Sequence, residues 1–329
     1  MTGRERVPGG RKVQFHMAVR SSTPRGVEFR KIGGRIGAEA VGVSLHTPLS
    51  DEGVLAIRQA LWDHKVVFFR DQHDLPDPAL VDLGDRLGAV ATVAEPNAPV
   101  SDDRKVVVIK EIKEYRTDHW HMDATFAEEP PGISLLWPVE LPAFGGDTLW
   151  ASTAAGYLDL PANLRAFAED LWIVHTNRYQ FADPRAFDEL PPVPESADAA
   201  GRWFTFMPRP FETVHPAVTV HPETGERALL LGTHAQHVVG FPSQIAHQLI
   251  EILQYYVTRP ENVLRWRWRL GDVALFDNRL TEHYAPSDFE GRRTMHRISL
   301  VGSRPTSVGG GHFAPTGGSA SYFANGSAP

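Results

Sequence analysis

Short runs of β-branched and aromatic residues, separated by turns, are the feature that most limits how this chain can fold. Lys65–Arg70 (KVVFFR) and Lys105–Lys110 (KVVVIK) are typical of buried strands, because such side chains pack well on a pleated surface. Helical segments are too few and too uneven for regular alternation with strands. The pattern predicts an antiparallel sandwich or jelly roll, mainly β with flanking helices. The other expected strands are Val27–Ile32, Ile133–Trp137, Val218–His221, Arg227–Leu231, Val263–Arg269, Val273–Phe276 and Thr294–Val301.

Several segments with helical periodicity predict helices outside the sheets. Ser50 is a suitable N-cap for the first of them, and Pro161 is harmless at a helix start because its missing N–H needs no partner there. The expected helices are Ser50–Lys65, Pro78–Leu87, Ala151–Asp159, Pro161–Leu171 and Ser243–Val257.

The chain divides into one domain and two terminal extensions. Residues 1–26 are basic and predict a disordered leader, residues 27–303 form the jelly-roll domain, and residues 304–329, rich in Gly, Ser, Ala and Pro, predict a mobile tail. Within the domain, Arg178–Glu212 contains six prolines and little periodicity. A loop of that length is usually a lid or a binding loop.

Composition excludes several classes of function. The chain has no cysteine, so disulfide scaffolds, thiolate zinc sites, iron–sulfur clusters and cysteine nucleophiles are ruled out. The absence of cysteine also fits the reducing cytoplasm. A net charge of -7 argues against nucleic-acid binding, and no apolar run approaches the roughly 20 residues of a membrane span. The chain has 15 histidines, so a histidine-ligated metal is worth seeking.

The segment Trp120–Asp123 (WHMD) suggests such a metal. Residues two apart in an extended segment share a face, so His121 and Asp123 project an imidazole and a carboxylate to one side. These are two of the donors in a 2-His-1-carboxylate iron site, although the pair also arises by chance. His283 is the best placed third donor, because it follows a predicted strand and a turn. The alternative is a surface histidine in a loop.

Two further motifs are candidates for a functional site, namely a pair of arginines on one strand and a Gly-Gly turn. On the strand that begins at Thr294, Arg293 and Arg297 share one face and can clamp two anions. The alternative, of equal weight, is that both face solvent or pair with Glu290. Gly145–Trp150 (GGDTLW) forms a tight turn that enters a strand, and its simplest interpretation is a hairpin turn.

Together the motifs resemble one known family, the taurine dioxygenase-type (TauD/TfdA) iron(II)- and 2-oxoglutarate-dependent dioxygenases. The matching segments appear in family order and cover roughly residues 27–303. They are KVVFFRDQ (Lys65–Gln72), WHMDATF (Trp120–Phe126), PAFGGDTLW (Pro142–Trp150), HPETGERAL (His221–Leu229), RWRW (Arg265–Trp268), and GDVALFDNRLTEHYA running on to RRTMHRISL (Gly271–Leu300).

The resemblance implies a double-stranded β-helix, a cupin-like jelly roll. It implies that His121, Asp123 and His283 bind iron(II) and are the catalytic residues. It further implies that 2-oxoglutarate and O2 are co-substrates, and that oxidation of a substrate C–H bond yields succinate and CO2. The presence of Asp123 argues against halogenation, which in related enzymes needs a small residue at that position.

The resemblance also implies the anion-binding residues. Arg293, ten residues after the distal histidine, corresponds to the arginine that binds the distal carboxylate of 2-oxoglutarate, and Thr148 donates a hydrogen bond to the same group. Arg297 corresponds to the arginine that binds the anionic head of the primary substrate. Within Leu230–Val239, His234 and His237 lie where family members often line the substrate pocket, although they could be ordinary loop residues.

The substrate half of the site departs from the family pattern. Gly88–Pro96 lacks the substrate-binding histidine of taurine-type members, and the usual Asn before the His-x-Asp motif is missing. Taurine is therefore not the expected substrate. This departure slightly favours tailoring of a carboxylate, amino acid or nucleotide in biosynthesis over oxidative cleavage of an alkyl sulfonate or sulfate ester.

Two other classes of function compete with the dioxygenase. A zinc-type metal-dependent hydrolase could use the same three donors, but would give Arg293 and Thr148 no role. A non-catalytic metal-binding jelly roll would tolerate loss of the donors, yet all three are present. We expect a small anionic substrate, no nucleic-acid or membrane partner, a cytoplasmic location, and a homo-oligomer such as a dimer or tetramer.

Overall fold

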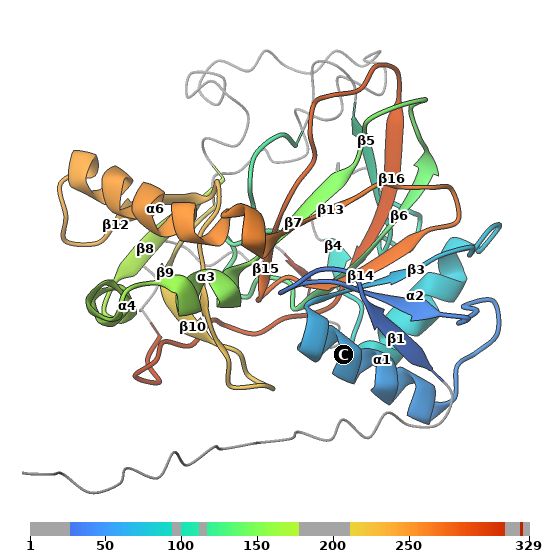
Figure 1. The fold of residues 1–329 in the computed structure, drawn as a ribbon, viewed down its shortest axis with the longest axis horizontal. Helices are drawn as coiled ribbons and strands as arrows, with labels where there is room; N and C mark the ends of the chain where they lie inside the picture. The colour runs from blue at the N-terminus through green and yellow to red at the C-terminus, as the bar shows by residue number, and fades with distance from the viewer. Residues whose placement is uncertain (1–26, 94–99, 112–116, 178–210, 313–322, 325–329) are drawn as a thin grey trace, which may run out of the picture.

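The computed structural model describes residues 27–93, 100–111, 117–177, 211–312 and 323–324, and their fold is mainly β, as predicted. A seven-stranded sheet has the strand order β1-β2-β3-β14-β6-β16-β5 (Figure 1). Its neighbouring strands are antiparallel, except that β2 and β3 run parallel. The strands are β1 (Glu28–Lys31), β2 (Ala38–Val41), β3 (Val66–Phe69), β14 (Val273–Asp277), β6 (Ile133–Glu140), β16 (Arg293–Ser299) and β5 (Val107–Glu111).

A three-stranded antiparallel sheet packs against the large sheet through an aromatic core. Phe68 of the large sheet stacks on Trp266 of the small one with ring centroids 3.8 Å apart, and it meets Trp150 edge-on at 5.4 Å. Two sheets that share a core in this way form the predicted sandwich. The small sheet has the order β13-β7-β15, with β13 (Val263–Trp266), β7 (Thr148–Ser152) and β15 (Thr281–Tyr284).

The alternation of side chains along β3 explains why helices cover the other face of the large sheet. Val66 and Phe68 join the core between the sheets, whereas Val67 and Phe69 join a second apolar cluster with side chains of two helices. Ser50 caps the first helix by accepting a hydrogen bond of 3.1 Å from Gly53 N. The helices are α1 (Asp51–His64) and α2 (Asp77–Leu87).

The remaining helices pack on a third group of strands, which Figure 1 shows on the left. A three-stranded sheet of order β12-β8-β9 and a hairpin of β10 and β11 share an apolar cluster with α3, α4 and α6. The elements are α3 (Thr153–Asp159), α4 (Ala162–Glu169), β8 (Trp172–Thr176), β9 (Glu212–Pro216), β10 (Val218–Val220), β11 (Arg227–Leu229), β12 (Ala235–Val238), α6 (Ser243–Val257) and the 3₁₀ helix η1 (Pro260–Asn262).

The predicted helix Ala151–Asp159 begins two residues too early. Ala151 and Ser152 end β7: Ala151 pairs with both β13 and β15, while Ser152 pairs with β15 and then caps α3. Pairing on two sides therefore overrides the local helical preference of alanine. The prediction also missed β2, β4 (Thr92–Val93), β8, β9, β12, β15 and β17 (Phe323–Ala324), most of which have only two to four residues.

The predicted leader, residues 1–26, lies outside the described residues. Residues 178–210 of the proline-rich segment also lie outside them. In the predicted tail, the backbone oxygen of Thr306 accepts a hydrogen bond of 2.9 Å from Val220 N, and Ser307 forms an antiparallel bridge with Thr219. These two tail residues therefore lie along β10. Further on, β17 (Phe323–Ala324) pairs with β4 (Thr92–Val93). Among the described helices, none is both long and apolar enough to cross a membrane.

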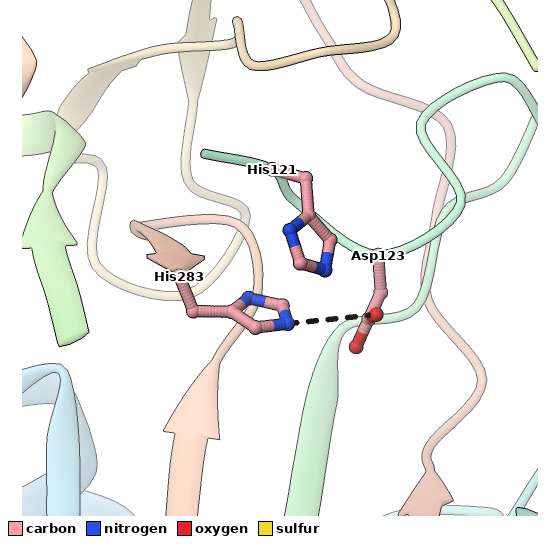
Figure 2. Close-up of side chains that lie close together, drawn as sticks. All are labelled: His121, Asp123 and His283. Carbon is pink, nitrogen blue, oxygen red and sulfur yellow. Dashed lines mark ion pairs between the residues drawn. The ribbon is translucent and has the colours of Figure 1, made fainter. Parts of the chain in front are cut away.

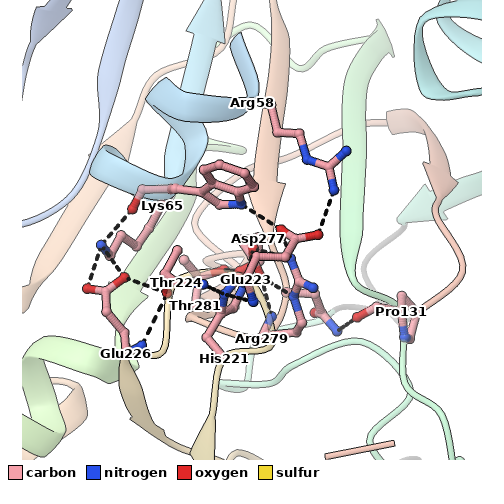
Figure 3. A network of polar contacts seen from close by, with 12 residues as sticks. Arg58, Lys65, Pro131, His221, Glu223, Thr224, Glu226, Asp277, Arg279 and Thr281 are labelled. Atoms are coloured by element: carbon pink, nitrogen blue, oxygen red, sulfur yellow. Dashed lines mark hydrogen bonds and ion pairs between the residues drawn. The ribbon is translucent and has the colours of Figure 1, made fainter. Parts of the chain in front are cut away.

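A buried ion-pair network joins the β10–β11 hairpin to the turn after β14 (Figure 3). His221 Nε2 lies 2.9 Å from Asp277 Oδ2, and both side chains are fully buried. Arg279 binds the same carboxylate at 2.6 Å and also contacts Glu223, which in turn pairs with Arg58 of α1. Burial alone would raise the pKa of Asp277, but Arg279 and His221 lower it to about 2.

We predict that Asp277→Asn lowers the free energy of unfolding at pH 7 by about 3 kcal/mol, because Arg279 loses its buried charge partner. The pKa of Asp277 is about 2 in the fold and 3.8 as an unperturbed group. Its stabilising contribution is therefore complete above about pH 4 and is lost as the pH falls through about 2. Urea unfolding across this range should show the variant and wild type converging in acid.

The matched control is Asp63→Asn, an exposed carboxylate on α1 that accepts one hydrogen bond of 3.0 Å from Gln59. Its effect should stay within about 0.5 kcal/mol at every pH. Equal effects of the two substitutions would show that the network does not stabilise the fold.

Candidate metal centre and anion-binding residues

His121, Asp123 and His283 form a buried cluster whose three donor atoms lie within 4.8 Å of one another. Figure 2 shows the two imidazoles and the carboxylate turned toward a common point. His283 Nε2 lies 3.8 Å from Asp123 Oδ1, and the two imidazole centroids are 4.0 Å apart. The structure thus brings together the three donors predicted from the sequence. His283 lies on β15, not in a surface loop.

The backbone explains why these side chains meet. His121 and His283 form an antiparallel bridge, with N–H···O distances of 3.0 and 2.8 Å in the two directions. The chain turns directly after Asp123, where Ala124 has a φ of 49°. Gly232 packs against the other side of His121, and a Cβ on this residue would lie 2.9 Å from His121 Cα. Only glycine combines this close approach with its φ of 87°.

Burial keeps both imidazoles neutral. It lowers the pKa of His121 well below its usual value and the pKa of His283 to about 4. His121 Nδ1 lies 2.9 Å from the backbone oxygen of His119, so Nδ1–H donates there and the Nε2 lone pair remains for a ligand.

The donor set fits a divalent transition metal. Two neutral imidazoles and one carboxylate on neighbouring backbone segments are the donors of a 2-His-1-carboxylate facial site, which leaves coordination positions open. The carboxylate also carries the negative charge that a divalent cation among these three donors would partly neutralise.

Arg293 and Thr148 meet beside this cluster. Arg293 is buried, donates from Nη2 to Thr148 Oγ1 at 2.9 Å and from Nε to Gly146 O at 2.9 Å. Trp268 Nε1 donates to the same hydroxyl at 2.9 Å. Since Thr148 Oγ1 accepts twice, its own proton is available to an acceptor.

The Gly-Gly segment before Thr148 is not the hairpin turn allowed by the sequence. It leads from β6 in the large sheet to β7 in the small sheet, and these two strands do not pair. A Cβ on Gly146 would lie 2.9 Å from Pro142 and 3.3 Å from Arg293, so the turn packs tightly against the arginine.

Arg297 lies on the same face of β16 as Arg293, and both point inward. Arg297 forms an ion pair with Asp123 Oδ1, while Ser134 Oγ lies 3.3 Å from the other carboxylate oxygen. The structure therefore supports the inward orientation over solvent exposure for both arginines. It also shows a contact that the sequence did not predict, between a candidate substrate-binding residue and a candidate metal ligand.

The two histidines expected in the substrate pocket differ in position. His234 is buried, packs edge-to-face on Phe126 at 4.9 Å, and has its pKa lowered to about 4 by burial. The charge of Asp123 acts on it in the opposite direction, which puts it near the cluster. His237 is half-buried on β12, and among the described residues no contact joins it to the donors.

Three residues around the site were not singled out from the sequence: Ser134, Trp268 and Asn278. Trp268 and Asn278 belong to the quoted RWRW and DNR segments, so their segments were noticed but their roles were not. The roles of Trp268 and Asn278 depend on partners more than 100 positions away. Trp268 contacts Thr148, and Asn278 contacts Asp123. Local periodicity carries no signal for such contacts.

Comparison with known proteins gives a consistent result. The model of the family "Taurine catabolism dioxygenase TauD, TfdA family" matches residues 28–299. An alkylsulfatase of Acinetobacter baylyi is 40% identical over 286 residues, which cover 86% of this chain and 88% of the relative. An alpha-ketoglutarate-dependent sulfate ester dioxygenase of Pseudomonas putida is 41% identical over 297 residues, covering 89% and 96%.

The structural comparison agrees with the fold described above. A crystal structure of a taurine dioxygenase from Burkholderia xenovorans superposes with a TM-score of 0.73 at 32% identity, covering 89% of this chain and 95% of that one. The family's jelly-roll architecture, expected from the sequence, is thereby confirmed. The chain belongs to the TauD/TfdA family and is an iron(II)- and 2-oxoglutarate-dependent dioxygenase.

Proposed function

We propose that this dioxygenase cleaves alkyl sulfate esters oxidatively. The observation that carries the proposal is the pair of inward-pointing arginines on β16, one bound to Thr148 and one beside the buried His-Asp-His cluster. Two cationic groups near a candidate metal centre suit two anionic ligands. The relatives at 40% and 41% identity are named for sulfate ester chemistry, which supports a sulfate as the second anion.

In this proposal His121, Asp123 and His283 bind iron(II). Bound iron(II), with 2-oxoglutarate and dioxygen, supplies oxidation of a C–H bond, with succinate and carbon dioxide as co-products. The protein keeps both imidazoles neutral by burial and fixes the tautomer of His121 through the His119 carbonyl. The surrounding apolar core also excludes water from the oxidation.

Arg293 and Thr148 bind the distal carboxylate of 2-oxoglutarate. Arg293 is only 3% exposed, and a hydrogen bond from a desolvated guanidinium to a carboxylate is strong. Its hydrogen bonds to Gly146 and Thr148 fix the guanidinium, and the Thr148 proton completes the carboxylate site. A zinc hydrolase or a non-catalytic jelly roll would leave this arrangement without a purpose.

Arg297 and His234 bind the sulfate group of the substrate, with a weaker contribution proposed for His237. Arg297 pairs with Asp123 in the structure, so a sulfate entering the site gains a guanidinium that is already desolvated and oriented. Charges also balance: the positive charges of two arginines and a divalent cation match those of Asp123, dianionic 2-oxoglutarate and a monoanionic ester. A zwitterionic substrate such as taurine would upset this balance.

The chemistry of the ester explains cleavage. Insertion of one oxygen atom into a C–H bond of the carbon that bears the ester oxygen gives a hydroxylated ester. Its C–O bond to sulfate then breaks, the hydroxyl proton leaves with the sulfate, and an aldehyde remains. The missing histidine in Gly88–Pro96 slightly favours biosynthetic tailoring, but the names of the relatives support cleavage of a sulfate ester.

The proposal retains a cytoplasmic location and a homo-oligomer. The lack of cysteine fits the former. Exposed apolar side chains on three neighbouring helices support the latter, namely Leu158, Phe167, Ile245, Ile252 and Tyr255.

Arg293→Ala should raise the 2-oxoglutarate KM roughly 10- to 100-fold, because a buried charge-assisted hydrogen bond to a carboxylate is lost. The wild-type preference for 2-oxoglutarate over 2-oxopentanoate, which lacks the distal carboxylate, should largely disappear in the variant. Arg30→Ala, which removes an exposed arginine paired with Glu39, is the control and should change neither value. An unchanged 2-oxoglutarate preference in Arg293→Ala would remove Arg293 from the proposal.

Product analysis tests the proposed reaction itself. With iron(II), 2-oxoglutarate and oxygen, hexyl sulfate should give hexanal, sulfate and succinate in equal amounts, together with oxygen uptake. Hexanol released without oxygen would indicate hydrolysis. Turnover of heptanoate with no turnover of alkyl sulfates of several chain lengths would favour the tailoring alternative.

A further inference from the structure

We propose that Asn278 is a positioning residue that fixes the backbone of Asp123 and thereby sets the affinity of the site for iron(II). The inference rests on the proposed role of Asp123 as an iron ligand. Asn278 acts through the peptide groups on either side of the Asp123 side chain, to which its amide is hydrogen-bonded.

The Asn278 side chain forms hydrogen bonds with both backbone polar groups of Asp123. Its Oδ1 accepts a hydrogen bond of 2.8 Å from Asp123 N, and its Nδ2 donates to Asp123 O at 3.1 Å. The same Nδ2 donates to Pro131 O at 3.1 Å. The amide of a single side chain thus satisfies both backbone polar groups of the ligand residue, and Asn278 is itself only 2% exposed.

Asp123 needs this support because little else holds its main chain. It lies outside the strands, directly before the positive φ of Ala124, and no main-chain partner for its N–H or C=O occurs in the described part of the chain. Two such groups, buried without Asn278, would lack hydrogen bonds and would favour a shift of the segment. Ser134, 3.3 Å away, and Arg297 contact the carboxylate of Asp123, and these contacts leave its peptide groups to Asn278.

Asn278 is itself rigidly held. It lies between Asp277 and Arg279 of the ion-pair network in Figure 3. Asn278 N donates to Gly132 O at 3.0 Å, and Thr281 Oγ1 donates to Asp277 O at 2.8 Å. This turn continues into β15, which carries His283. The same turn therefore positions two candidate ligands. It fixes the backbone of His283 because it continues into β15, and it fixes the backbone of Asp123 through the amide of Asn278.

The test compares iron(II) affinity among variants by anaerobic calorimetric titration with Fe(II) alone. Asn278→Ala and Asn278→Ser should both raise the Kd for Fe(II) about 10- to 100-fold, the usual effect of removing a residue that orients a metal ligand. The matched control is Asn262→Ala. Asn262 is also fully buried and makes three side-chain hydrogen bonds, to Arg35, Asp159 and Tyr256, at 2.8, 3.3 and 2.8 Å.

The control variant should lose stability yet keep the wild-type Kd, which separates positioning from general destabilisation. Circular dichroism identifies the folded variants, and Asn278→Ser decides the question if Asn278→Ala does not fold. A Kd within threefold of wild type in a folded Asn278 variant would overturn the inference. If wild type itself binds no Fe(II), the proposed function fails instead, so the two failures are distinguishable.

Discussion

The two backbone hydrogen bonds between His121 and His283 are the contact on which the rest of the site depends. They join a loop segment to β15, which is paired in turn with β7, so the candidate metal donors and Thr148 belong to one continuous hydrogen-bonded unit. The facing sheet supplies Arg293 and Arg297 from β16. The site is therefore assembled between two sheets whose separation is fixed by the stacked Phe68 and Trp266. The site is complete only when both sheets are packed together.

Burial determines the chemistry available to each side chain. It keeps the histidines neutral and therefore able to donate lone pairs, while it makes Arg293 a strong binder of anions. The same burial would penalise the charge of Asp123 if Arg297 and Ser134 did not contact its carboxylate. Ligand binding therefore also compensates buried charge. A bound cation would offset the carboxylate of Asp123, and bound anions would offset the arginines.

Much of the fold and the donor set could be predicted from the sequence because the signals are local. The spacing of His121 and Asp123 and the alternation of Arg293 and Arg297 along one strand are period-two patterns, and both survive in the structure. The start of α3 was misplaced because Ala151 pairs with strands distant in sequence. The ion pair between Arg297 and Asp123 and the hydrogen bonds between Asn278 and Asp123 also escaped prediction, since each joins residues more than 150 positions apart.

The most direct test of the account is the visible charge-transfer absorption of the protein on anaerobic addition of iron(II) and then 2-oxoglutarate. We expect an absorption band that requires both iron(II) and 2-oxoglutarate. The band should be absent when succinate replaces 2-oxoglutarate, and it should be lost in Asp123→Ala. Iron(II) binding with no band in the presence of 2-oxoglutarate, or a band that persists unchanged in Asp123→Ala, would contradict it.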